Sequence, residues 1–223
     1  MKSIFSDKAT VVIRAMLAEP QRKWTVRDFE AEFNVGRSRA AQVLAELRKK
    51  GFVGGVTSGR KAYSQLTDKE GLINEWLRVY NFELNENHLY YSESDILKTM
   101  KVFLENRKWE DKYALTLHTG ANLISNYVNT PVTYCYLDSH CFKEMSLEIR
   151  QALDLKELKR GGNICFIKPY YKNSVFFHKQ KIKGLSVVSN LQLYLDLYHF
   201  PQRGREHADY LLKVLKEKEV EIG

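Results

Sequence analysis

The sequence predicts an α+β protein, in which a small helical N-terminal part precedes a mixed α/β sheet domain. Three observations support this class. The first 70 residues hold three stretches of helical periodicity followed by a hairpin signal. The remaining residues alternate strand-like runs with amphipathic helices. Positive charge is concentrated at the start, with 14 Lys and Arg against 8 Asp and Glu in residues 1–70, and 21 against 19 in residues 71–223.

Composition narrows the class of protein and of partner. The 223 residues are 44% hydrophobic and 28% charged, which is typical of a folded chain rather than a disordered one. A net charge of +8 favours an acidic partner, and nucleic acid is the commonest such partner. No apolar run approaches a membrane span and the opening is too polar for a signal peptide, so a cytoplasmic protein without membrane contact is expected. Three cysteines without a CxxC pattern predict reduced thiols.

The first two helices are predicted from their ends as much as from their apolar spacing. One helix is expected from Asp7 to Glu19, and Pro20 ends it because the residue before proline avoids helical geometry. Thr25 is predicted to cap the second, shorter helix, and Asp28 stands where a capping box needs its second member. Gly36 then permits the turn into a third helix.

The third helix lies in "NVGRSRAAQVLAELRKKGFV", residues 34–53, and has two unlike sides. The inward stripe is Ala40, Leu44 and Leu47. The opposite side carries small, polar and basic residues, with Arg39 and Glu46 flanking them: Ser38, Gln42, Ala45 and Lys49. Because Arg and Gln side chains commonly hydrogen-bond guanine and adenine, this side is typical of a recognition helix in the major groove.

A hairpin is predicted next, from two β-prone runs, 52–57 and 62–66, that flank "SGRK". Three helices followed by a hairpin is the order of a winged helix-turn-helix, which we assign to residues 1–70. Arg60 and Lys61 at the hairpin tip are expected on phosphate or in the minor groove. The full set of predicted DNA contacts is Arg37, Ser38, Arg39, Gln42, Lys49, Arg60 and Lys61. The alternative is a protein-interaction module, because the same unit also serves that role.

The rest of the chain predicts a linking helix from about Lys69 to Tyr80, assigned to a link over 71–90, and an α+β domain over 91–223. A further amphipathic helix lies in "SESDILKTMKVFLENRK". Strands are predicted at 113–117, in "TPVTYCYLD", in "GGNICFIKPYY" and in "KGLSVVS". Ser189 is expected to cap a helix over 190–197, and a closing helix follows over 204–218.

Asp196 falls among apolar residues of the helix over 190–197, and a carboxylate in such surroundings needs a hydrogen-bond donor. Arg203, Arg205 or the backbone of the turn are the predicted donors. The favoured interpretation is structural, an ion pair that fixes the last helix to its neighbour. The alternative is a surface offered to a partner protein.

Other chemistry finds little support in the residue pattern. Cys135, Asp138, His140 and Cys141 fit no zinc spacing, so no metal and no cofactor are expected. No catalytic residues are assigned and the chain is not expected to be an enzyme, since a metal-dependent nuclease or nucleotidyltransferase needs clustered carboxylates. In "FIKPYYKNSVFFHKQKIKG", a strand pair with solvated lysines is favoured over a site for single-stranded nucleic acid.

Three segments resemble the AbiEi-type antitoxin family, transcriptional regulators of type IV toxin–antitoxin systems. They are "GLSVVSNLQLYLDLYHFPQRGREHADYLL" at 184–212, "YALTLHTGANLISNYV" and "GGNICFIKPY". With the predicted winged helix in front, the resemblance extends over nearly the whole chain.

The resemblance implies a bacterial regulator with two domains. Its N-terminal domain would bind repeats of double-stranded DNA at its own promoter and repress its operon. Its C-terminal domain would oppose a nucleotidyltransferase-like toxin. Because no heptad run predicts a coiled coil, a dimer is expected to form on DNA or through globular surfaces. A toxin-binding module without a main DNA role is the second hypothesis, and a metal-dependent enzyme acting on nucleic acid is the third.

Overall fold

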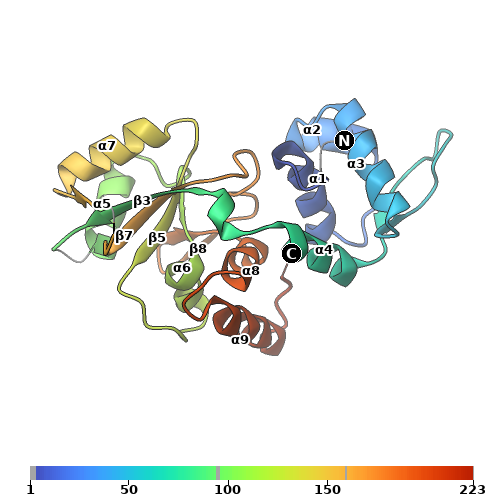
Figure 1. Ribbon diagram of the computed structural model, residues 1–223. Helices are drawn as coiled ribbons and strands as arrows, with labels where there is room; N and C mark the ends of the chain where they lie inside the picture. Colours follow the sequence, from blue (N-terminus) through green and yellow to red (C-terminus); the bar gives the residue numbers. More distant parts are fainter. Residues whose placement is uncertain (1–3, 94–95, 159, 223) are drawn as a thin grey trace. The chain divides into compact units, whose positions relative to one another are not determined.

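The computed structural model describes residues 4–93, 96–158 and 160–222, and the chain divides into two compact units. The first unit reaches to Tyr80, and the second runs from Asn81 to Ile222 (Figure 1). None of the helices in the three described ranges combines the length and apolarity that a membrane crossing requires.

Four helices and one short hairpin make up the N-terminal unit. The helices are α1 (Asp7–Ala18), α2 (Val26–Phe33), α3 (Arg37–Lys49) and α4 (Lys69–Val79), and the strands are β1 (Val53–Gly54) and β2 (Gln65–Leu66). The three helices predicted within residues 1–70 are confirmed, with bounds that differ by a residue or two. The first unit also takes in α4, which begins the segment predicted as a link.

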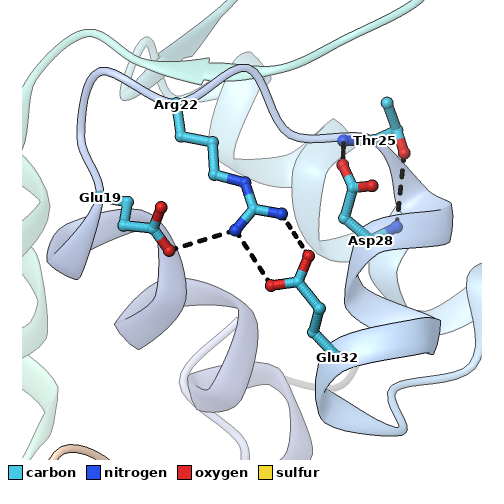
Figure 2. Close-up of polar contacts among 5 residues, drawn as sticks. All are labelled: Glu19, Arg22, Thr25, Asp28 and Glu32. Atoms are coloured by element: carbon cyan, nitrogen blue, oxygen red, sulfur yellow. Dashed lines mark hydrogen bonds and ion pairs between the residues drawn. The ribbon is translucent and has the colours of Figure 1, made fainter.

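The start of α2 is fixed by the predicted capping box, which is confirmed (Figure 2). The Thr25 backbone N–H donates to Asp28 Oδ2 at 2.7 Å, and the Asp28 backbone N–H donates to Thr25 Oγ1 at 3.4 Å. Beside the cap, Arg22 donates to the carboxylates of Glu19 and Glu32 (Figure 2). These ion pairs join the end of α1 to α2.

Trp24 connects the helices of this unit to its hairpin. The side chain is fully buried and stacks on Phe29 of α2, with ring centroids 4.9 Å apart. The backbone pairs with Ser64 in both directions, because each N–H donates to the other's carbonyl oxygen at 2.7 Å. The segment before α2 therefore acts as a third, one-residue strand beside β2.

The hairpin is confirmed as antiparallel, but its strands are shorter than the two predicted runs. Val53 pairs with Leu66, and Gly54 pairs with Gln65. Gly55 stops the ladder: it has a φ of +120°, and a Cβ built there would lie 2.4 Å from the Tyr63 carbonyl oxygen. Residues 55–61 beyond this point are exposed.

The C-terminal unit is built on a mixed seven-stranded sheet, in the order β6-β3-β7-β5-β4-β9-β8. Pairs β5–β7 and β4–β9 are parallel, and the other four pairs are antiparallel. The strands are β3 (Glu86–Tyr91), β4 (Tyr113–Leu115), β5 (Thr133–Leu137), β6 (Lys156–Glu157), β7 (Ile164–Lys168), β8 (Gln180–Ile182) and β9 (Leu185–Val187).

Helices cover both faces of this sheet, so β5 is buried along its whole length. Helices α6 (Leu117–Ile124), α8 (Asn190–Tyr198) and α9 (Gly204–Glu217) pack together, as Figure 1 shows. On the opposite face, Phe142 of α7 (Phe142–Ala152) contacts His88 of β3, with ring centroids 5.0 Å apart. The other helical segments are η1 (Phe82–Leu84) and α5 (Ile96–Asn106).

Most predicted elements of this unit are confirmed, and the differences have local causes. The strand predicted over 113–117 ends at Leu115, because α6 begins at Leu117. The linking helix predicted from about Lys69 to Tyr80 is confirmed as α4, and the rest of the predicted link over 71–90 holds η1 and the start of β3. Four elements were not predicted: η1, β3, β6 and α7. The strand pair favoured in "FIKPYYKNSVFFHKQKIKG" corresponds to the end of β7 and to β8, but these two strands are not neighbours in the sheet.

Candidate functional site

Helix α3 has the two unlike sides that its sequence predicts. Ala40, Val43, Leu44 and Leu47 are buried. The opposite side is exposed at Arg37, Ser38, Gln42, Ala45 and Lys49, whereas Arg39 and Glu46 are half-buried at its borders. The side proposed above to face DNA bases is thus open to solvent within its own unit.

Two arginines at the start of α3 already have partners on the protein. Arg37 Nε donates to Glu30 Oε2 at 2.5 Å, which ties α3 to α2. Arg39 donates to the Ser6 hydroxyl and, at 3.5 Å, to Gln42 Oε1. Any DNA contact by Arg37 must therefore compete with an exposed ion pair, which is a weak interaction.

Arg60 and Lys61 lie on the exposed hairpin tip, next to Gly59, whose φ of +89° forms the turn. An open groove of about 610 Å³ separates this hairpin from α3. Of the predicted contacts only Arg60 lines this groove; α3 contributes Ala41, Leu44, Ala45 and Arg48 to it instead.

A second candidate cluster centres on Asp196, which is fully buried in α8. Thr116 Oγ1 and Tyr136 OH donate to its carboxylate at 2.5 and 3.1 Å. Gln192, one turn earlier in α8, donates through Nε2 at 2.7 Å. The carboxylate therefore ties α8 to β5 and to the residue after β4, and it takes the donors that a buried charge requires.

The structure places neither of the two predicted arginine donors at Asp196. Arg203 donates to Glu206, and Arg205 donates to Asp209, in exposed ion pairs within α9. Arg205 also lies over the ring of Tyr198, 4.0 Å from its centroid. Neutral groups from distant parts of the chain replace the expected charges, because α8 packs directly on the sheet.

A pair of buried histidines lies near this cluster. His118 of α6 and His207 of α9 stack, and their Nδ1 atoms are 2.8 Å apart. Their Nε2 atoms lie 3.1 and 3.2 Å from the carbonyl oxygens of Gln202 and Ser125. Burial lowers the pKa of both rings, and that of His207 falls to about 4.

The chain segments that form these contacts are those quoted above for their resemblance. Thr116 and His118 belong to "YALTLHTGANLISNYV", whereas Asp196 and His207 belong to the segment 184–212. Gly120 lets the two segments approach, because a Cβ there would lie 2.9 Å from both the Leu115 carbonyl oxygen and Leu193 Cδ2. Sequence reasoning missed Thr116, Tyr136 and Gln192 as partners, although the four-residue spacing of Gln192 and Asp196 is a signal for the last of them.

A family model described as "Transcriptional regulator, AbiEi antitoxin, Type IV TA system" matches residues 65–217. The chain belongs to this AbiEi antitoxin family. The match includes the whole described sheet of the C-terminal unit and the Asp196 and His118–His207 clusters. No curated protein and no solved structure matches the chain.

Two of the three cysteines of this AbiEi-family chain are buried and the third is half-buried. Cys135 and Cys165 are buried in the sheet, and burial raises the pKa of Cys165 to about 12. Burial and the neighbouring Asp138 also raise the pKa of Cys141, which opposes a nucleophilic role. Within the described ranges, no three His, Cys, Asp or Glu side chains gather as a metal site would require.

We predict that Asp196→Ala lowers the free energy of unfolding by about 3 kcal/mol, because it leaves two hydroxyls and an amide buried without their acceptor. Asp209→Ala is the control, since it removes an exposed carboxylate and should change stability by less than about 1 kcal/mol. Urea unfolding followed by circular dichroism measures both, and equal losses would contradict the role given to Asp196.

We also predict that acid destabilises the C-terminal unit through His207. The unfolded ring binds a proton near its ordinary pKa of 6.5 and the folded ring only near 4, so the unfolded state holds more protons between these values and stability falls as pH falls. From pH 7 to pH 5 the loss should be about 2 kcal/mol. His207→Gln should flatten this dependence in urea unfolding at the two pH values, and an unchanged slope argues against it.

Proposed function

We propose that the chain is a DNA-binding, autoregulating antitoxin of a bacterial type IV toxin–antitoxin system, acting in the cytoplasm. Its N-terminal unit is proposed to be a winged helix-turn-helix over residues 1–70, with α3 as the recognition helix and the β1–β2 hairpin as the wing. The observation that carries this proposal is the exposed polar side of α3, backed by a fully apolar buried side.

Charge supports the same proposal. The excess of Lys and Arg lies in residues 1–70, and Lys49, Arg60 and Lys61 from this region are all exposed. Duplex DNA binds such surfaces through its phosphates, and the released counterions make the affinity fall with salt. Arg37, Ser38, Arg39 and Gln42 are proposed to reach base edges from the first turns of α3.

The C-terminal unit is proposed to oppose a nucleotidyltransferase-like toxin. This assignment comes from membership of the AbiEi antitoxin family. A dimer is proposed to form on repeated DNA sites, since two half-sites require two copies of the recognition helix. Gel shifts with the DNA upstream of the gene and with a scrambled duplex test the DNA role.

Gln42→Ala is expected to relax base preference, because an amide side chain pairs with adenine through two hydrogen bonds. The ratio of affinities for upstream and scrambled DNA should shrink by roughly 1–3 kcal/mol, with little loss on the scrambled duplex. An unchanged ratio in the gel shifts would remove Gln42 from the base contacts.

Arg60→Ala is expected to weaken binding to both duplexes alike, since a phosphate contact carries no sequence information. The slope of log affinity against log salt should become shallower by about 0.9. Titrations at several salt concentrations measure the slope, and a loss confined to the upstream duplex would contradict the phosphate assignment.

A further inference from the structure

The groove between α3 and the hairpin is lined by three arginines, and the predicted interface includes only one of them, Arg60. Arg27 at the start of α2, Arg48 near the end of α3 and Arg60 of the hairpin all line it. Ala41 and Ala45 line the same wall of α3 as Arg48, at a spacing of one helical turn. No carboxylate is among the described residues that line the groove.

The groove arginines differ from Arg22 and Arg37 in how their charge is compensated. Arg22 and Arg37 each lie against carboxylates, from Glu19 and Glu32 and from Glu30 respectively. In the described part of the chain no ion pair engages Arg27, Arg48 or Arg60.

Arg48 is held in place by one hydrogen bond, and a second donor of its guanidinium group lacks an acceptor. One terminal nitrogen donates to the Ser64 hydroxyl at 2.7 Å, and Ser64 is fixed by its backbone pairing with Trp24. The Nε–H of Arg48 is buried and has no hydrogen-bond partner in the structure. A buried N–H without an acceptor is unfavourable, so this arrangement lacks one hydrogen bond that its guanidinium group can still make.

The chemistry of the groove fits a phosphodiester. Guanidinium groups bind phosphate oxygens through paired N–H donors, and they keep their charge at every physiological pH. The small side chains of Ala41 and Ala45 leave room for a strand to approach the wall of α3. The absence of lining carboxylates removes the repulsion that phosphate would otherwise meet.

We propose that this groove binds the sugar-phosphate backbone of one strand of duplex DNA, with Arg27 and Arg48 as its phosphate-binding residues. The proposal rests on the DNA-binding function proposed above and adds a second contact surface to it. The backbone lies between α3 and the hairpin, while the adjacent side of α3, with Ser38 and Gln42, faces the bases.

The test compares the full-length protein with Arg27→Gln and Arg48→Gln, using the upstream duplex and a scrambled duplex of equal length. Each variant should bind both duplexes about fivefold to tenfold less tightly near 0.1 M salt, and each should make the salt slope shallower by about 0.9. Arg78→Gln is the matched control. It removes one positive charge from a side chain that is 77% exposed on α4, and its slope should equal that of the wild type.

The outcomes separate this proposal from the proposed function. If the wild type binds neither duplex, the proposed function fails. If the wild type binds both and Arg27→Gln behaves like Arg78→Gln, the groove proposal fails alone. Arg27 is exposed, so its variant tests the proposal even where loss of the Arg48–Ser64 bond unfolds the second variant. Tighter binding to single-stranded RNA of the same length, lost in Arg27→Gln, would overturn duplex DNA as the occupant.

Discussion

The paired backbone hydrogen bonds between Trp24 and Ser64 are the constraint on which the N-terminal unit depends. Strands β1 and β2 contribute only two residue pairs, too few to hold a hairpin by themselves. Trp24 supplies the missing support, because its ring is fixed against Phe29 in the core. The Ser64 hydroxyl in turn accepts a hydrogen bond from Arg48 and so fixes the position of that side chain. One bridge therefore sets the position of the hairpin and of a cation on α3 together.

The positions of the carboxylates determine which arginines of this unit form ion pairs within the fold and which do not. Glu19 and Glu32 hold Arg22 beside the Trp24 ring, where its guanidinium carbon lies 3.8 Å from the ring centroid. By contrast, none of the described residues that line the groove is acidic. Arginine thus has a structural role at position 22 and, as proposed, a phosphate-binding role in the groove. Net charge alone does not distinguish the two roles.

Sequence patterns predict the elements whose signals are local. Helices α1 to α4 follow from apolar spacing and from caps such as Thr25, and the two-sided character of α3 follows from the same spacing. Helix α7 was not predicted, although Phe142, Met145 and Ile149 recur at helical spacing and are buried. Strand β6 has no local signal, because its two charged residues become a strand only by pairing with β3. The need of Asp196 for a donor is visible in the sequence. The donors are not, since Thr116 and Tyr136 lie 80 and 60 residues away along the chain.

The sheet of the C-terminal unit ends on a short strand at each edge. Strand β6 has two residues and β8 has three, and Lys156, Glu157 and Lys181 are exposed along them. Such borders present few unpaired backbone groups, and their charges must be desolvated before another strand can dock. Copies that bind adjacent DNA repeats, as proposed above, are thereby discouraged from fusing their sheets into a continuous ribbon.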